Sequence, residues 1–234
     1  MTLNILSAGA AKAVVNTLAE TFTGSERVAV SAVFNAAGTI RAQFAAGEPC
    51  DVVILPIAML DALAVERRID ASTHAPLGHV PTGIAVATGV AAPRIGDAAA
   101  TRSAFEHASA IYCPDTQRST AGLHVVRVLN EMGIHASVAD RLRDYANGAE
   151  AMAALAALGT DRDRAIGCTQ VTEILYTPGV TLVGVLPPPF ELTTVYSAAV
   201  SAHSRDPERA RRFAALLTGS HSEALRVESG FAQR

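Results

Sequence analysis

The chain has 234 residues, half of them hydrophobic and 18 % charged, with a formal net charge of −3. This length is enough for one large domain or for two lobes of about 100 residues each. Arginines and acids of nearly equal number exclude a basic surface for nucleic acid, and the lack of tryptophan argues against a carbohydrate-stacking surface. No segment reaches the ~18 uninterrupted apolar residues of a membrane span.

The cysteines and the start of the chain suggest a compartment. Cys50, Cys113 and Cys168 lack metal-type spacing, and their odd number prevents complete internal pairing, which fits a reducing environment. The segment after Met1 has neither a basic start nor an apolar run of secretory length. We therefore expect a cytoplasmic protein, or a periplasmic one if a leader has been removed.

The first predicted unit is a strand, a small-residue turn and a helix. An apolar strand from Leu3 enters the turn Ser7–Ala11, and the helix that follows has Lys12 among its first residues. Lys12 is the only lysine in the chain. Helix N-termini with small side chains are typical anion sites, although a lysine there is also commonly a solvated surface residue.

The same pattern then repeats. A β-branched strand over Val28–Phe34 ends in the small turn Asn35–Thr39, and a helix follows through Ile40 and Phe44. A buried strand is predicted over Asp51–Pro56, a helix over Ala58–Arg68, and an extended crossover over His79–Ala87. Alternation of this kind predicts a mostly parallel sheet with ligands bound beyond the carboxyl ends of its strands.

A second series of elements follows. The predicted helices and strands are, in order, a helix over Ala98–His107, a strand over Ala110–Cys113, a polar loop over Pro114–Gly122, a helix over Leu123–Met132, an extended piece over Ser137–Leu142, a helix over Ala149–Gly159, strands over Ala165–Thr169, Val180–Leu186 and Thr193–Ser201, and helices over Pro207–Leu217 and Glu223–Glu228.

Two crossings of the chain divide it into lobes. We expect an α/β, two-lobe, periplasmic-binding-protein-like fold with a mostly parallel sheet and flanking helices in each lobe. The discontinuous lobe is 1–82 with 193–234, the inserted lobe is 83–192, and the hinge lies near 80–85 and 190–198. Helix N-termini of both lobes are expected to point into a ligand cleft between them.

These features resemble the periplasmic molybdate-binding protein family, which has a type II solute-binding fold. The similarity is carried by Ser7–Ala11, by Ala37–Ile54 with its Gly-Thr-x-x-x-Gln-x-x-x-Gly-x-x-x-Asp-Val pattern, by the Ser119–Gly122 loop and by Pro207–Phe231. The resemblance implies serine hydroxyls in the first turn and before Gly38, where this chain has Ala10 and Ala37. Each lost charge-assisted hydrogen bond is worth about 1.5–3 kcal/mol, so molybdate is not the expected ligand unless Ser7 substitutes.

A second resemblance concerns a branch of this family. Ile166–Ile174, with Pro178–Val180 and Val183–Pro187 after it, is similar to a branch related to aconitate isomerase. This resemblance implies an enzyme that moves a double bond or changes its geometry in an unsaturated polycarboxylate. The branch also contains members with no demonstrated activity.

The candidate site residues lie near the predicted turns, and each has a structural alternative. Lys12, Arg41 and Arg118 are the cations nearest these turns; Arg118 fits a carboxylate contact and a solvated loop equally, whereas Arg41 fits a solvated helix face better. Hydroxyls at helix starts are commonly caps, and Glu173 is either a general base or a partner of a helix dipole. The expected catalytic residues are Lys12 and Glu173; the expected ligand contacts are Ser7, Ala10, Lys12, Ala37, Gly38, Thr39, Arg118, Ser119, Thr120, Thr169, Gln170 and Tyr196. Cys113 and Cys168 come at strand ends near the same space, although buried cysteines are commonly inert.

No metal or cofactor is expected, because the seven histidines are dispersed and no nucleotide fingerprint occurs. Two functions remain open. The first is a cytoplasmic isomerase of a small unsaturated di- or tricarboxylate. The second is a non-catalytic binding protein for an oxyanion or organic acid, and only this one requires a transporter as a partner.

Overall fold

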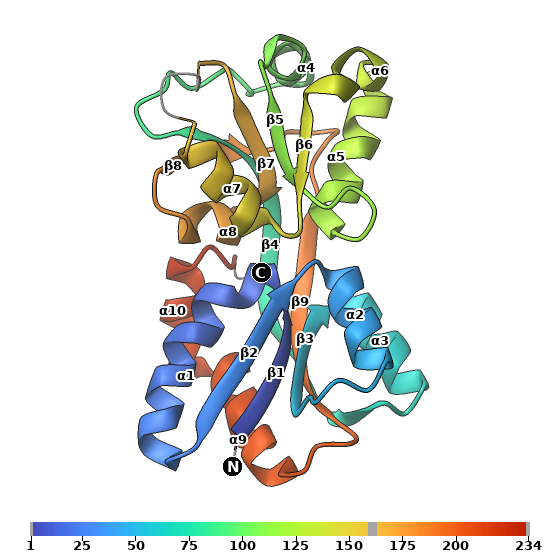
Figure 1. Ribbon diagram of the computed structural model, residues 1–234, viewed down its shortest axis with the longest axis vertical. Coiled ribbons are helices and arrows are strands. Elements are labelled where there is room, and N and C mark those ends of the chain that lie inside the picture. The colour runs from blue at the N-terminus through green and yellow to red at the C-terminus, as the bar shows by residue number, and fades with distance from the viewer. Residues whose placement is uncertain (1, 159–162, 233–234) are drawn as a thin grey trace. The chain divides into compact units, whose positions relative to one another are not determined.

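The structure is a computed structural model that describes residues 2–158 and 163–232 (Figure 1). The chain divides into two compact units. Unit 1 comprises the chain up to Val80 and from Thr194 onward, and unit 2 is Pro81–Thr193. Each unit has its own sheet and its own hydrophobic core.

Unit 1 is built on a mixed sheet whose parallel part comes first in the sequence. Its strands are β1 (Thr2–Ala8), β2 (Ala29–Asn35), β3 (Val52–Pro56), β9 (Thr193–Ser201) and the first part of β4 (Ile69–Ala87), in the order β2-β1-β3-β9-β4. Strand β1 is parallel to β2 and β3, whereas β9 is antiparallel to β3. The carboxyl ends of β1, β2 and β3 therefore share one edge, which we call the carboxyl edge of unit 1.

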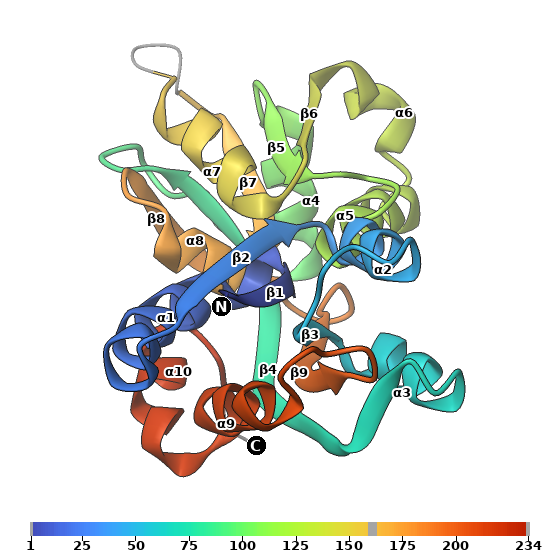
Figure 2. The ribbon, with the colours of Figure 1, turned by 60° about the horizontal axis from the view of Figure 1, so that its bottom comes forward.

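Helices cover both faces of this sheet (Figure 2). Helix α1 (Lys12–Glu26) packs against α9 (Pro207–Thr218), with the rings of Phe22 and Phe213 edge to face at 5.0 Å. A single core unites α1, the sheet and α9. The remaining helical segments are η1 (Gly9–Ala11), α2 (Ala37–Ala45), α3 (Ile57–Val65), η4 (Ser220–Ser222) and α10 (Glu223–Glu228).

Unit 2 also contains a mixed sheet. Strand β5 (Ile111–Pro114) is parallel to β6 (Leu142–Tyr145) and β7 (Ile166–Gln170), while the second part of β4 is antiparallel to β7 and β8 (Val180–Val185). The carboxyl ends of β5, β6 and β7 form the carboxyl edge of unit 2. This parallel core is again the part of the sheet that places helix starts at one edge.

The helices of unit 2 bury two apolar clusters against its sheet. The larger cluster gathers residues of α4, α5 and the strands, such as Phe105, Val125 and Leu129, and the smaller one packs Met152 and Leu155 of α7 over Tyr112. The helical segments are α4 (Ala98–His107), α5 (Thr120–Glu131), α6 (His135–Val138), η2 (Ala139–Arg141), α7 (Gly148–Ala156) and α8 (Val171–Tyr176). In neither unit is any described helix long and apolar enough to cross a membrane.

The α/β fold and the repeated β-α pattern are confirmed, whereas some details differ from the sequence prediction. The expected mostly parallel sheets are mixed, because β9 in unit 1 and β4 with β8 in unit 2 run antiparallel. The expected extended piece over Ser137–Leu142 is wrong up to Arg141, since α6 and η2 occupy it and the Ser137 hydroxyl donates to the Ile134 carbonyl. Gly159, the predicted end of one helix, lies outside the described residues.

Strand β4 begins at Ile69, ten residues before the predicted crossover. Its early part contains Pro76 and Gly78, which favour a loop when the sequence is considered alone. Pairing with β9 holds this segment extended, and the Val200 amide also donates to the Thr73 hydroxyl at 2.9 Å. Tertiary pairing therefore overrides local preference here.

Candidate functional site

Helical segments start at the carboxyl edge of unit 1 after each of its three parallel strands. Strand register aligns the ends of β1, β2 and β3, because Ser7 pairs with Phe34 on one side and with Ile54 on the other. Each strand then leads directly into a helical segment: η1 and α1 after β1, α2 after β2, and α3 after β3. Backbone amides of several first turns are thus collected at one edge.

None of these helix starts is capped by the side chain at its N-cap position. The N-cap residues are Ala8 for η1, Ala11 for α1, Ala36 for α2 and Pro56 for α3, and none supplies a side-chain hydrogen bond. The first turns also lack acidic residues. The positive ends of these helix dipoles are therefore not offset by a local carboxylate, which favours an anion from outside the chain.

Lys12 is the first residue of α1 and is partly buried. Its Nζ lies 5.8 Å from the centroid of the Phe34 ring, within the range of a cation–π interaction. A cation at a helix N-terminus opposes the dipole, and an anion that binds there is attracted both by Lys12 and by the helix start. The small residues around it, Ala10 and Ala11, are buried and present no polar side chain.

The other predicted contacts of unit 1 differ in accessibility. Gly38 and Thr39 are partly exposed in the first turn of α2, whereas Ala37 is buried. Ser7 is fully buried and its hydroxyl donates to the Ala8 carbonyl at 2.9 Å, while Tyr196 packs in the core. Thus Lys12, Gly38 and Thr39 are the partly accessible residues among these contacts, whereas η1 and Ala37 are buried.

Arg41 lies on the outer surface of α2. Its Nη2 is 3.4 Å from Oε1 of Glu66, and both side chains are largely exposed. An exposed pair of this kind contributes little to stability and leaves no guanidinium directed at the helix starts. The solvated alternative for Arg41 is the one that this geometry favours.

The carboxyl edge of unit 2 is organised differently, because its own side chains occupy two of its three helix starts. The Ser119 hydroxyl caps α5 by accepting from the Gly122 amide at 3.5 Å. Asn147 caps α7 by accepting from the Glu150 amide at 3.0 Å, and its Nδ2 donates to the Glu150 carboxylate. The short helix α8 has no side-chain cap from Gln170.

Glu173 reinforces the start of α7. One carboxylate oxygen accepts from the Thr169 hydroxyl at 2.6 Å, and the other accepts from the Gly148 amide at 3.1 Å. Glu173 is only 5 % exposed, and a Cβ at Gly148 would overlap both the carboxylate and the Thr169 hydroxyl. The carboxylate is therefore an internal anion at this helix start, which matches the dipole-partner alternative for Glu173.

The remaining predicted residues of unit 2 lie around these caps. Arg118 is exposed, and its amide donates to Asp115 Oδ1 at 2.9 Å in the turn before α5. Thr120 is partly exposed at the first position of α5, whereas Gln170 is buried and pairs with Thr82 across β7 and β4. Gly122 has no room for a Cβ beside the carbonyls of Pro114 and Asp115, so this turn requires glycine.

The cysteines have a structural role. Cys113 and Cys168 are fully buried in the larger core of unit 2, and all three thiols are free. Burial raises the pKa of the Cys113 thiol from 9.0 to about 12, and it raises the pKa of Cys168 still further. Protonated thiols in an apolar core are poor nucleophiles, so neither cysteine is suited to chemistry at the carboxyl edge.

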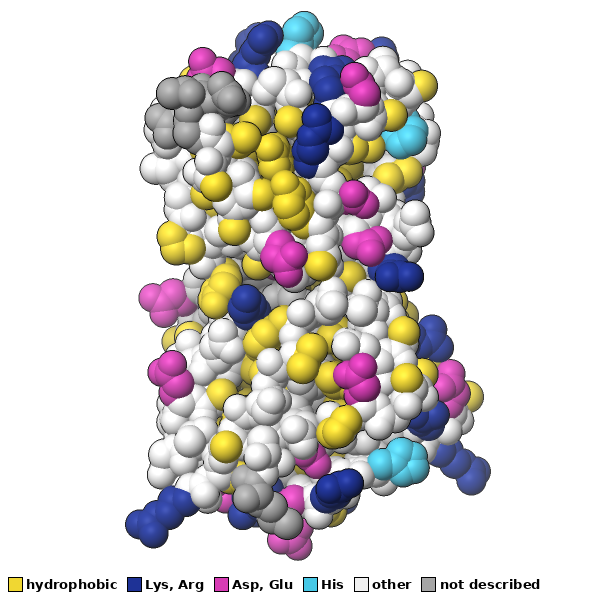
Figure 3. Space-filling view, in the orientation of Figure 1, with side chains coloured by type: hydrophobic (Ala, Val, Ile, Leu, Met, Phe, Trp, Pro, Cys, Tyr) yellow, Lys and Arg dark blue, Asp and Glu magenta, His cyan; other side chains and the backbone are white. Residues whose placement is uncertain are grey.

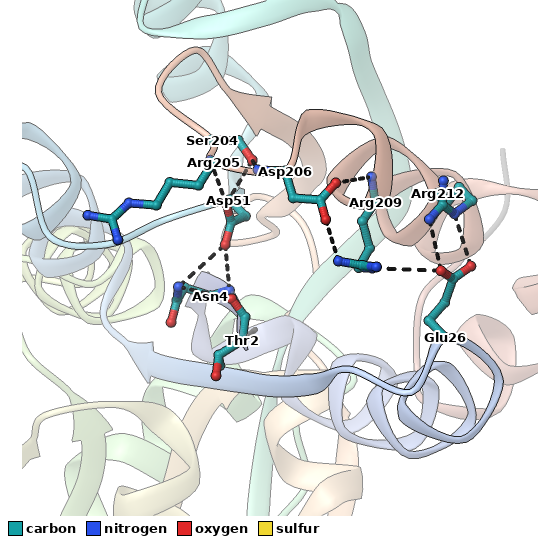
Figure 4. A network of polar contacts seen from close by, with 9 residues as sticks. All are labelled: Thr2, Asn4, Glu26, Asp51, Ser204, Arg205, Asp206, Arg209 and Arg212. Atoms are coloured by element: carbon teal, nitrogen blue, oxygen red, sulfur yellow. Dashed lines mark hydrogen bonds and ion pairs between the residues drawn. The ribbon is translucent and has the colours of Figure 1, made fainter.

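A cavity of about 530 Å³ lies at the opposite, amino edge of the unit 1 sheet, and three of its charged residues, Asp51, Asp206 and Arg209, are engaged with other groups of the protein. Asp51 accepts from the Asn4 amide at 2.8 Å and from the Ser204 hydroxyl at 2.7 Å (Figure 4). Arg209 is paired with Asp206 and with Glu26. This network ties β1, β3 and the start of α9 together, so we assign it to stability.

By themselves, neither the surface charges nor the possible metal ligands among the described residues indicate a further functional site. Acidic and basic side chains are interspersed over the face in Figure 3, without a broad basic patch. Among residues 2–158 and 163–232, no group of three or more His, Cys, Asp or Glu side chains is placed to hold a metal ion.

Comparison with known proteins assigns the family. The model of the bacterial extracellular solute-binding protein family matches residues 3–232, which is nearly the entire chain. The chain belongs to this family. An aconitate isomerase from Pseudomonas sp is a relative, 26 % identical over 235 residues, and the match covers 98 % of this chain and 87 % of the relative.

Solved structures agree on the fold of this solute-binding protein. The periplasmic molybdate-binding protein of Azotobacter vinelandii superposes with a TM-score of 0.80 at 16 % identity, covering 99 % of each chain. The sulfate-binding protein of Mycobacterium tuberculosis gives a TM-score of 0.69 at 18 % identity, covering 99 % of this chain and 86 % of that one. At these identities the likeness establishes the fold alone.

Within each unit, the structure gathers the predicted residues at a carboxyl edge. Phe34 and Asn147 were not predicted from the sequence: the Phe34 ring contacts Lys12, and Asn147 caps α7. The Asn-x-x-Glu spacing from Asn147 to Glu150 is a capping-box signal that the sequence contains. Phe34 carried no such signal, because its relation to Lys12 depends on strand register.

Proposed function

We propose that this solute-binding protein binds a small organic anion at the carboxyl edge of unit 1 and catalyses a double-bond shift in it. The observation that carries the proposal is the position of Lys12, the only lysine, beside helix starts that lack side-chain caps. A carboxylate of an unsaturated di- or tricarboxylate fits the amides and the ammonium group together.

The missing hydroxyls at Ala10 and Ala37 favour carboxylates over tetrahedral oxyanions. A dianion such as molybdate requires many donors around a single centre, and alanine supplies none from its side chain. A carboxylate is planar and accepts from one or two amides and one cation. Uncapped first turns and one ammonium group are sufficient donors for such a group.

The proposed reaction is an allylic proton shift. A base removes a proton from the carbon beside the double bond, the electron pair spreads over the allyl system and its carboxylate, and the proton returns to the far alkene carbon. The composition of the substrate does not change, so no oxidant or reductant is required. Lys12 is suited to stabilise the charge on the carboxylate, or to act as the base when it is neutral.

The relative that is an aconitate isomerase supports this choice of substrate class, since the match extends over 98 % of the chain. Glu173 is the less suitable base, since both of its oxygens already accept hydrogen bonds within unit 2.

A second candidate function is a non-catalytic receptor for an organic acid or oxyanion that delivers its ligand to a transporter. The family model and the similar binding-protein structures favour it. The same carboxyl edge would hold the ligand, but no proton transfer would follow. Binding and turnover must therefore be measured separately.

The decisive experiment is proton NMR of cis- and trans-aconitate in D₂O with catalytic amounts of protein. We expect interconversion together with deuterium incorporation at the allylic carbon. Lys12→Ala should remove turnover and weaken binding by about 10- to 100-fold, which corresponds to one charge-assisted hydrogen bond. Lys12→Arg keeps the charge but cannot act as a base near neutral pH, so it separates binding from proton transfer.

Arg211→Gln is the matched control, because Arg211 is an exposed cation whose Nη2 pairs with Asp70 at 2.9 Å, away from the helix starts. This substitution should leave both the binding and the turnover of aconitate unchanged. Binding of aconitate without interconversion or deuterium exchange would favour the receptor. A thermal shift produced by molybdate, tungstate or sulfate alone would contradict both the substrate class and the reaction.

A further inference from the structure

A cavity of about 540 Å³ lies in unit 2, between the end of β4, the segment that follows it, helix α4 and the start of β7. This is the amino edge of the unit 2 sheet, because β7 begins at Ile166 and Ala108 comes shortly before β5. The cavity is therefore at the other end of the strands from the carboxyl edge of unit 2. Its volume falls in the range of ~300–1,000 Å³ that is typical of small-molecule sites.

The inner part of this cavity is apolar. Val86, Ala108 and Ile166 line it and are at most 2 % exposed. Ala100 and Ala104, one turn apart on α4, line it with methyl groups only. Small aliphatic side chains leave room for a hydrocarbon group and offer it no polar partner. The inner part therefore suits an apolar body, whose burial releases water from both surfaces.

The rim of the cavity is polar and carries more positive than negative charge. Arg94 and Arg164 are exposed lining residues, and neither side chain forms an ion pair with another described residue. Asp163 is the acidic residue among the described lining residues, so two guanidinium groups stand against one carboxylate. His107 is engaged within α4, where its Nδ1 donates to the Ser103 carbonyl at 2.8 Å. Because a guanidinium holds a carboxylate through two parallel N–H groups, this rim favours an organic acid.

We propose that this cavity is a second ligand site, which takes a small organic acid with an apolar body, such as an aryl-substituted alkanoate. The hydrocarbon part lies against Val86 and Ile166, and the carboxylate lies at the rim in the field of Arg94 and Arg164. A tricarboxylate such as aconitate is unsuited to this cavity, because part of its charge would have to enter the apolar interior. The inference is independent of Lys12 and of the carboxyl edge of unit 1.

The probe is 4-phenylbutyrate, titrated into the full chain with ¹³C-labelled valine and isoleucine methyl groups. We expect a Kd of about 0.1–1 mM, as for other ligands with about a dozen heavy atoms. The largest methyl shifts should occur at Val86, Val90 and Ile166, while Val53 in the unit 1 core should remain unchanged. The uncharged analogue 4-phenylbutan-1-ol should bind about tenfold more weakly, because it lacks the charge-assisted hydrogen bonds. trans-Aconitate should not shift these methyl signals.

Two kinds of variant test the two parts of the cavity. Arg94→Gln should raise Kd for 4-phenylbutyrate by about three- to tenfold, as expected for one charge-assisted hydrogen bond. Its control is Arg102→Gln, since Arg102 is an exposed arginine of α4 that does not line the cavity and pairs with Glu106 at 3.0 Å.

Ala100→Leu should fill the apolar part and raise Kd by more than tenfold. Its control is Ala99→Leu at the exposed neighbouring position, which does not line the cavity. Both controls should bind as the unmodified protein does, and circular dichroism confirms that each variant is folded.

The outcomes separate this inference from the proposed function. No methyl shift at ten times the upper end of the expected Kd range, or largest shifts outside the cavity, would overturn the second site. Equal affinity for the acid and the alcohol, or unchanged Kd in Arg94→Gln combined with Arg164→Gln, would overturn its preference for an organic acid. Full affinity in Ala100→Leu, or its loss in Lys12→Ala, would show that the probe binds elsewhere. Binding of 4-phenylbutyrate as expected, in a protein without affinity for aconitate, would support this site and refute the proposed function.

Discussion

The two carboxyl edges are built from the same β-α elements, yet they treat their helix starts in opposite ways. In unit 1, η1, α1, α2 and α3 all begin without a side-chain cap. In unit 2, Ser119 caps α5, and Asn147 with Glu173 satisfies the start of α7. Equivalent topology therefore does not imply equivalent anion affinity, because a carboxylate of the protein at a helix start weakens the attraction of that helix start for an external anion.

The largest change in the free energy of unfolding should come from filling the space beside Glu173. Gly148→Ala places a methyl group where the Glu173 carboxylate and the Thr169 hydroxyl lie, so both hydrogen bonds must be lost or displaced. We expect unfolding to require about 3 kcal/mol less free energy, the upper part of the range for overpacking. Urea unfolding followed by circular dichroism measures this value.

The control is Gly24→Ala in α1, where a Cβ meets nothing within 4 Å. It should leave stability unchanged or raise it slightly, because alanine favours a helix more than glycine does. Equal destabilisation by both substitutions would contradict the role assigned to the packing around Gly148.

Glu173→Gln should have the next largest effect, and it separates structure from catalysis. The amide keeps the shape but removes the charge that accepts from Thr169 and Gly148. We expect a loss of about 1.5–2 kcal/mol in the free energy of unfolding, with turnover reduced less than tenfold at a temperature where the variant is folded. Turnover reduced by several hundredfold, with unchanged stability, would instead identify Glu173 as the base.

The buried thiols predict a pH dependence of stability. Because the pKa of Cys113 is raised from 9.0 to about 12 in the folded protein, the unfolded chain loses this proton first as the pH rises. The protonated Cys113 thiol therefore contributes fully to the free energy of unfolding below pH 9. Above pH 9 this contribution decreases by up to ~1.4 kcal/mol per pH unit. Urea unfolding at pH 8, 9 and 10 should show a shallower decline for Cys113→Ala; an identical decline would contradict this assignment.

The smallest expected effect comes from adding a cap to unit 1. Ala36 is the N-cap residue of α2, and its extended ψ of 143° suits a serine that accepts from the first turn. Ala36→Ser should raise the free energy of unfolding by about 0.5–1 kcal/mol and weaken aconitate binding by about two- to tenfold. Calorimetry measures both effects, and unchanged affinity with a more stable helix would show that this amide is not used by the ligand.

The sequence predicted most of the fold because its apolar periods and small-residue turns act locally. The helix over Ala98–His107 has the predicted bounds, and Lys12 begins α1 as expected. The early part of β4 was missed, because its extended conformation depends on pairing with β9 rather than on residues near it in the chain. The helical turn at His135–Arg141 was mistaken for a strand because its short mixed pattern has no clear period.

The candidate site was less predictable for a related reason. Residue type and spacing placed Lys12, Ser119 and Glu173 near strand ends. Neither feature shows which helix starts already accept a hydrogen-bonding side chain from the protein itself. That distinction depends on contacts between distant residues, such as the hydrogen bond from the Gly148 amide to Glu173. The pairing of Lys12 with Phe34 likewise arises only when β2 lies beside β1.

The contrast between the two carboxyl edges is tested most directly by amide NMR during titration with trans-aconitate. We expect the largest shifts at the amides of Gly9–Lys12 and Ala37–Thr39, while those of Gly148–Glu150 remain nearly unchanged. Lys12→Ala should greatly reduce the shifts in the first group. Largest shifts at Gly148–Glu150, or shifts in the first group that persist at the same aconitate concentrations in Lys12→Ala, would show that the carboxyl edge of unit 1 and Lys12 do not form the anion site.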